Sequence, residues 1–143
     1  MMKLADAFNI SERADILAPI FSDESLPPLE RVKRSFETLI TIFEGDNCSK
    51  GCLLGNLADQ LENVRQYLEE SLQIWTGWLT TLLLQAQKEN AIPANMNTEM
   101  LAENLLSSFQ GALLLSKVKK SPEPLRNFIH LYFYRVLAQR AEI

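Results

Sequence analysis

The stretch LENVRQYLEESLQIWTGWLTTLLLQA, residues 61–86, decides the fold class of this chain. Its apolar residues recur in steps of three and four for about seven turns of ~3.6 residues each, which is the period of an α-helix. A second apolar stripe lies beside the first, so two adjacent faces of the helix are hydrophobic. The stretch therefore predicts a long central helix that other helices cover on more than one side. The first stripe is Leu61, Val64, Leu68, Leu72, Trp75, Leu79, Leu82 and Ala86, and the second is Tyr67, Ile74, Trp78 and Leu82.

The segments before the central helix also show helical spacing. Pro27-Pro28 predicts the start of a helix that continues to about Gly45, where Gly45-Asp46-Asn47 interrupts the apolar stripe. A short helix is expected from about residue 49 or 51 to 59. The first segment also has helical spacing, with an interruption near residues 9–11 and an end near Pro19, because proline disfavours a helix interior.

Two further helices are expected after the central one, which ends near Asn90 because Ala91-Ile92-Pro93 breaks the pattern. Asn97 or Thr98 can cap the next helix, and Ser121-Pro122 opens the last one, which carries apolar positions through Leu137. No segment alternates as a strand does. The sequence therefore predicts an all-α fold of five to six helices.

Composition bounds both the size and the partners of the molecule. The 143 residues carry 14 Lys and Arg against 18 Asp and Glu, a formal net charge of −4. This balance lacks the positive charge that neutralises nucleic-acid phosphates, so the chain alone is not expected to bind DNA. No apolar run reaches the ~18–20 residues that span a bilayer, and no membrane partner is expected. We expect a single domain over residues 1–143.

The last two predicted helices carry more apolar surface than one small domain can easily hide. Gly111 inside a helix costs ~1 kcal/mol relative to alanine, which favours the close approach of another backbone. A homodimer that buries the last two helices of each copy as a four-helix interface is the simplest explanation. A domain that wraps its own last helix is the alternative. The expected interface residues are Gly111, Leu114, Phe128, Leu131, Tyr132 and Arg135.

Trp75 and Trp78, on adjacent sides of the central helix, are the strongest indication of a ligand site. Ligand sites in helical domains often lie between helices and are lined by apolar and aromatic side chains. Ordinary core packing of the same aromatic residues is the alternative. The expected pocket, for a small apolar or aromatic effector, is lined by Phe36, Cys52, Trp75, Trp78, Phe109 and Leu113.

Catalytic chemistry is not expected. The two cysteines, Cys48 and Cys52, and the single histidine, His130, do not supply a set of four zinc ligands, so neither a metal nor a cofactor is predicted. No nucleophile–base pair stands near His130, so the chain is not expected to be an enzyme. Two cysteines are too few for a disulfide framework and suit a cytoplasmic location.

Cys52 has a second interpretation besides pocket lining. It stands close to a predicted helix N-terminus with Lys50 nearby, an environment that lowers the pKa of a thiol. A small buried side chain that fills space is the simpler alternative.

Several short motifs occur in a recognisable order. SLPPLER at residues 25–31 is followed by GCLLGNLA at 51–58, by Trp75, by QGALL at 110–114 and by EPL at 123–125. With this order and spacing, the chain resembles the C-terminal domain of tetracycline-repressor-like (TetR/AcrR) transcriptional regulators over about residues 25–137. The resemblance implies an effector pocket between the central helices and a dimer interface made by the last two. It also implies DNA contact only through an N-terminal helix-turn-helix module, which is absent from this chain.

Some members of this family sense electrophiles or oxidants through a cysteine, and the GCLLGN segment is most similar to repressors of N-ethylmaleimide reductase. The resemblance implies that Cys52 would act with a lysine of the next-to-last helix, here Lys117. Three functions follow as alternatives. The first is the effector-binding and dimerisation domain of a regulator, and the second is a cysteine-based sensor on the same scaffold. The third is a stand-alone protein that forms mixed dimers with full-length regulators.

Overall fold

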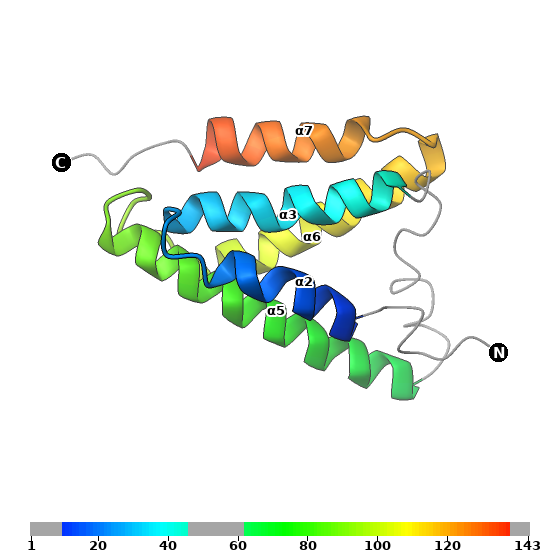
Figure 1. The fold of residues 1–143 in the computed structure, drawn as a ribbon, viewed down its shortest axis with the longest axis horizontal. Coiled ribbons are helices and arrows are strands. Elements are labelled where there is room, and N and C mark those ends of the chain that lie inside the picture. The colour runs from blue at the N-terminus through cyan, green and yellow to red at the C-terminus, as the bar shows by residue number, and fades with distance from the viewer. Residues whose placement is uncertain (1–9, 46–61, 138–143) are drawn as a thin grey trace.

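The computed structural model describes residues 10–45 and 62–137 and shows a bundle of helices (Figure 1). No strand occurs in these two ranges, and the predicted all-α fold class is confirmed. The short helix expected between residues 49 and 59, and the beginning of the N-terminal segment, lie outside the described residues. The α-helices are α2 (Ile10–Phe21), α3 (Pro28–Gly45), α5 (Glu62–Lys88), α6 (Thr98–Lys119) and α7 (Glu123–Leu131), and α7 continues into a π-helical segment, η1 (Tyr132–Val136).

α3 lies at the centre of the arrangement. In Figure 1, α7 runs beside α3 in the opposite direction, and α5, the longest helix, crosses below it. α6 packs against both α5 and α7, while α2 packs against α3 and α5. α3 is enclosed on several sides, and its apolar stripe is accordingly buried. The buried apolar side chains of α3 are Val32, Phe36, Leu39, Ile40 and Phe43.

The start of α3 agrees with the sequence prediction. Pro28 is the first helical residue, where its fixed φ suits the helix and its missing N–H would have had no partner in the helix. Glu30 stands in the first turn, where the helix dipole favours an acidic side chain. Local sequence signals therefore define where this helix begins.

The first helix ends at Phe21, two residues beyond the predicted end near Pro19, so Pro19 lies inside its last turn. A proline removes one backbone hydrogen bond, but a helix can continue when the residues beyond it are held in place. Here the ring of Phe21 packs against Trp78, with the centroids 5.2 Å apart. Arg31 of α3, a buried cation, donates from Nη1 to the carbonyl oxygen of Phe21 (3.4 Å) and from Nε to that of Leu26 (2.9 Å). Tertiary contacts therefore outweigh the local helix breaker.

One side chain holds the connection between α5 and α6. Gln87, in the last turn of α5, donates from Nε2 to the carbonyl oxygens of Pro93 (3.1 Å) and Met96 (2.6 Å). Asn90 takes a left-handed backbone conformation (φ 60°), and Ile92 is fully buried. The connection is thus packed and hydrogen-bonded, and the predicted end of the central helix near Asn90 is confirmed.

Both ends of α6 are capped. Asn97 is the N-cap residue, and its side chain accepts a hydrogen bond from the backbone N–H of Met100 (3.1 Å), which satisfies one of the free donors of the first turn. At the other end Lys120 takes a left-handed conformation (φ 50°), and its backbone N–H donates to the carbonyl oxygen of Ser116. The predicted cap at Asn97 is confirmed.

The final helix changes its winding at Tyr132. The backbone N–H of Leu137 donates to the carbonyl oxygen of Tyr132 over 2.7 Å, which is the five-residue bond of a π-turn. Val136 lies eleven residues after the buried Leu125, about three turns at ~3.6 residues each, so a regular α-helix would turn Val136 into the core. Instead Leu137 is buried (2% exposed) and Val136 is 38% exposed. The π-turn shifts the register of the chain end by one residue.

Five rings from α3, α6, α7 and η1 pack together in the core, and we call them the aromatic cluster. The ring centroids of Phe36 and Phe109 are 5.0 Å apart, and those of Phe36 and Phe128 are 5.1 Å apart. Tyr132 packs 5.3 Å from Phe128. Tilted and edge-on ring pairs at these distances are favourable beyond the area they bury. The cluster consists of Phe36, Phe109, Phe128, Tyr132 and Phe133.

Candidate functional site

The residues predicted to line an effector pocket fall into two groups. Phe36 and Phe109 are each 1% exposed, and Leu113 is 5% exposed. All three lie in the continuous hydrophobic core, and two of them belong to the aromatic cluster. These three side chains are packed in the core, and their role in lining an effector pocket stays a prediction.

The two tryptophans are placed differently. Trp75 and Trp78 are only partly buried on α5, and Trp78 packs against Phe21 at the end of α2. The sequence analysis did not identify Phe21 at this site, although Phe21 is the last aromatic residue before the turn signal Ser22-Asp23. Cys52, the remaining predicted pocket residue, lies outside the described residues. Within the described part of the chain, the candidate ligand site is therefore the face of α5 that carries the two tryptophans, next to α2.

The predicted dimer residues also separate into two groups. Phe128 is 6% exposed and belongs to the aromatic cluster within one chain, and Tyr132 is partly buried. Leu114 and Leu131 are 49% and 54% exposed, and Arg135 is exposed. The structure thus keeps only part of the predicted set at the surface.

Gly111 lies on the surface of α6, and a Cβ added there would meet nothing within 4 Å. Among residues 10–45 and 62–137, no contact requires a glycine at this position. Val118, which the sequence analysis did not select, is 73% exposed one turn beyond Leu114. We call the set Gly111, Leu114, Val118 and Leu131 the exposed apolar surface of α6 and α7.

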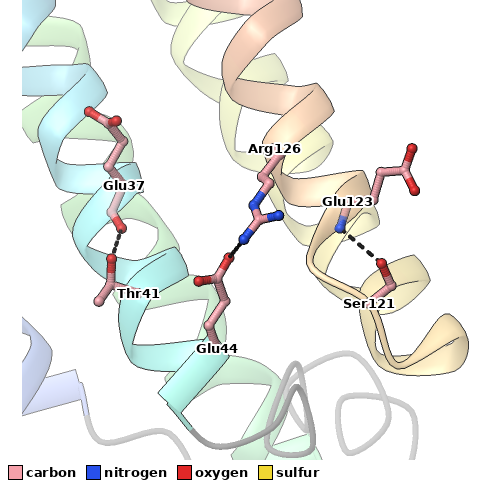
Figure 2. Close-up of polar contacts among 6 residues, drawn as sticks. All are labelled: Glu37, Thr41, Glu44, Ser121, Glu123 and Arg126. Carbon is pink, nitrogen blue, oxygen red and sulfur yellow. Dashed lines mark hydrogen bonds and ion pairs between the residues drawn. The ribbon is translucent and has the colours of Figure 1, made fainter.

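Polar contacts join α3 to the final helix at both of its ends. Near the start of α7, Nη2 of Arg126 lies 3.5 Å from Oε1 of Glu44 (Figure 2). At the other end, Nζ of Lys33 donates to the hydroxyl of Tyr134 over 3.1 Å, and this bond raises the pKa of Lys33 above its usual value. His130 is exposed, and its ring stacks on Tyr134 with the centroids 5.8 Å apart. These contacts orient the last helix.

Lys117, the predicted partner of Cys52, is partly buried in the last turn of α6. Because Cys52 lies outside the described residues, the pairing of these two side chains stays a prediction. Among the described residues, no group of three or more His, Cys, Asp or Glu side chains is arranged to hold a metal ion. None of the helices within residues 10–45 and 62–137 is both long and apolar enough to cross a membrane.

Two curated relatives of this chain are named as transcriptional regulators. The chain is 28% identical over 131 residues to the HTH-type transcriptional repressor DhaR of Mycobacterium sp. (strain GP1). This match covers 89% of the chain and 64% of that protein. It is 28% identical over 123 residues to the transcriptional regulator AcuR of Cereibacter sphaeroides, covering 83% of this chain and 56% of that protein. The chain thus spans less than two thirds of the length of either curated relative.

The fold has a solved counterpart. The crystal structure of the regulatory protein TetR from Rhodobacter sphaeroides superposes with a TM-score of 0.82 at 27% sequence identity, covering 90% of this chain and 71% of that one. The relatives are regulators by name rather than enzymes, as the sequence analysis predicted. Residues 28–132 match the family described as "Tetracyclin repressor-like, C-terminal domain", so the chain belongs to this family.

Proposed function

We propose that this chain is the effector-binding and dimerisation domain of a TetR-like transcriptional regulator. In this proposal DNA is contacted by a helix-turn-helix module outside this chain, in keeping with the net charge of −4. The proposal includes a cytoplasmic location, which the low number of cysteines supports.

The exposed apolar surface of α6 and α7 is the observation that carries the dimer. Leu114, Val118 and Leu131 leave 49%, 73% and 54% of their surface exposed. Leu114 and Val118 stand one turn apart on α6, and the packing of α7 on α6 brings Leu131 to the adjoining helix, so these exposed apolar residues favour an interface. Gly111 lies beside them with open space above it, which allows a second helix to approach closely. A symmetric dimer would place the same surface of both copies in contact.

Two substitutions of equal exposure test the dimer. Leu131→Lys places a charge on the proposed interface, whereas Ile74→Lys makes a similar change on α5, and both side chains are 54% exposed. Light scattering of the wild-type chain should give about twice the 16.3 kDa of one chain. Leu131→Lys should give the mass of the monomer, and Ile74→Lys should leave the dimer intact. A monomeric wild-type chain at micromolar concentration would contradict the proposal.

The tryptophan-bearing face of α5 is the proposed place of the effector. Trp75 and Trp78 are partly buried there, whereas Phe36, Phe109 and Leu113 are already enclosed by the core. Partly covered indole rings suit a small apolar or aromatic molecule. Since the chain has only these two tryptophans, their fluorescence reports on this face directly.

Titration with the aromatic dye 8-anilinonaphthalene-1-sulfonate tests the effector site. Binding should quench the tryptophan emission by energy transfer, and Trp78→Ala should weaken the binding of the dye. Leu84→Ala, on the same helix at a position 45% exposed, is the control and should bind as the wild type does. Equal binding by both variants would place the ligand elsewhere.

A further inference from the structure

We infer that Tyr132 is a positioning residue that fixes the register of the final helix against α6. That register in turn arranges the exposed apolar surface of α6 and α7 through which two copies would pair. The inference rests on the proposed dimer and adds which contacts within one chain position its dimer surface. Three parts of the Tyr132 residue, the hydroxyl, the ring and the backbone carbonyl, make separate contacts that together determine how α7 and η1 lie on α6.

The hydroxyl of Tyr132 reaches across to two side chains of α6. It lies 2.9 Å from Oγ of Ser108 and donates to Oδ1 of Asn104. Asn104 and Ser108 are four residues apart, so they stand on one face of α6, one turn from each other. A slide of α7 by one turn along α6, about 5.4 Å, would leave the hydroxyl beside at most one of these two side chains, so only the observed register allows both contacts. The hydroxyl therefore recognises one register.

The ring and the carbonyl of Tyr132 act on the final helix itself. The ring packs on Phe128, which ties it to the aromatic cluster. The carbonyl accepts the π-turn hydrogen bond from the N–H of Leu137, so the one-residue shift of the chain end begins at the residue that contacts α6. This shift buries Leu137 and exposes Val136. π-turns are energetically unfavourable unless other contacts hold them, and here the side chain of the same residue provides such contacts.

The contacts of Tyr132 lie next to the exposed apolar surface. Leu131 directly precedes Tyr132 and is 54% exposed, and Ser107 directly precedes Ser108 and is exposed. Gly111 lies one turn beyond Ser107 on the same face of α6. A symmetric interface requires α6 and α7 of each copy to lie in one relative position. Only the chains in that arrangement can pair, so the apparent affinity of the dimer falls with their fraction. Loss of the register therefore weakens association although no residue at the contact has changed.

Tyr134 provides a matched control. Its hydroxyl also takes part in one inter-helix hydrogen bond, which it accepts from Nζ of Lys33 on α3 and not from a residue of α6. Tyr132→Phe and Tyr134→Phe each remove one hydroxyl from η1 and keep the ring. In the full chain, denaturant unfolding at several protein concentrations yields both the stability of the monomer and the dimer dissociation constant.

We expect Tyr132→Phe, which removes the contacts with both Asn104 and Ser108, to raise the dimer dissociation constant by at least about threefold, while Tyr134→Phe, which removes one hydrogen bond, stays within about twofold. Asn104→Ala combined with Ser108→Ala should reproduce this effect from the other helix. Adding Tyr132→Phe to that double variant should then change the dissociation constant no further, because the hydroxyl has already lost its partners.

The possible failures are distinct. A wild-type chain that stays monomeric overturns the proposed dimer and this inference together. A dimeric wild type in which Tyr132→Phe and Tyr134→Phe associate alike overturns the inference alone. If Tyr132→Phe weakens the dimer further in the absence of both α6 side chains, the hydroxyl contacts the partner copy directly, and the positioning role is rejected.

Discussion

The guanidinium of Arg126, in the first turn of α7, lies 3.5 Å from the carboxylate of Glu44, in the last turn of α3 (Figure 2). This ion pair and the Lys33–Tyr134 hydrogen bond stand at opposite ends of the same pair of antiparallel helices. The Arg126 side chain is 68% exposed and that of Glu44 is 33% exposed. The pair is therefore a surface contact, and solvent screens much of its attraction.

Glu44→Gln should lower the free energy of unfolding by no more than about 0.5 kcal/mol, because exposed ion pairs of this kind contribute little. Urea unfolding in low salt and in 1 M salt measures the effect. The small difference between wild type and variant should vanish in high salt. A loss well above 1 kcal/mol that survives high salt would mean that Glu44 has a role other than this ion pair.

Phe36→Ala should lower the free energy of unfolding by about 3–5 kcal/mol, because it empties the centre of the aromatic cluster and leaves a cavity. Phe36 is 1% exposed and contacts the rings of Phe109, Phe128 and Phe133. Chemical denaturation followed by circular dichroism gives the value. Leu84→Ala, at a position 45% exposed, should change the stability by less than about 0.5 kcal/mol. Similar losses in both variants would show that Phe36 is not central to the core.

Asp23 should contribute to the acid sensitivity of the turn between α2 and α3. Hydrogen bonds from the Ser25 side chain and backbone N–H lower the pKa of Asp23 below the ordinary 3.8, with a further contribution from the charge of Arg31. A lowered folded pKa means that the stabilisation is complete above the unfolded pKa and is lost as the pH falls through the folded one. Unfolding of wild type and Asp23→Asn between pH 6 and pH 2 tests this. The difference should shrink below pH 3.8, and a constant difference would contradict it.

Cys52 should react faster with electrophiles than Cys48 if the cysteine-based sensor is the function of this scaffold. A thiol near a helix N-terminus and a lysine is more often a thiolate, which is the reactive form. Intact mass and peptide mapping after brief treatment with a quinone measure both sites in one sample, so Cys48 is the internal control. Lys117→Met should slow the modification of Cys52. Slow and equal labelling of the two cysteines would reject the sensor.

The ends of the helices were predictable from sequence where the residues at those ends determine them. The Pro28 start, the Asn97 cap and the end of α5 near Asn90 depend on the backbone preferences of single residues. The first helix continues two residues past Pro19, because contacts of Phe21 and Arg31 with residues distant in sequence hold its last turn. The π-turn at Tyr132 could not be read from periodicity, since a 3.6-residue period predicts Val136 rather than Leu137 in the core.

The candidate site was harder to predict than the fold, because periodicity identifies an apolar residue without saying what covers it. Phe36, Trp78 and Phe128 all fit a helical stripe, yet the first and last are enclosed by neighbouring rings and Trp78 is only partly covered. Aromatic content alone did not separate core from surface.

The amide of Gln87 has a mechanical consequence. It joins the last turn of α5 to the carbonyls of Pro93 and Met96, and Ile92 within this connection is buried. We therefore expect the connection to resist bending. A displacement of α5 beside Trp78 would then move α6 with it instead of being absorbed between the two helices.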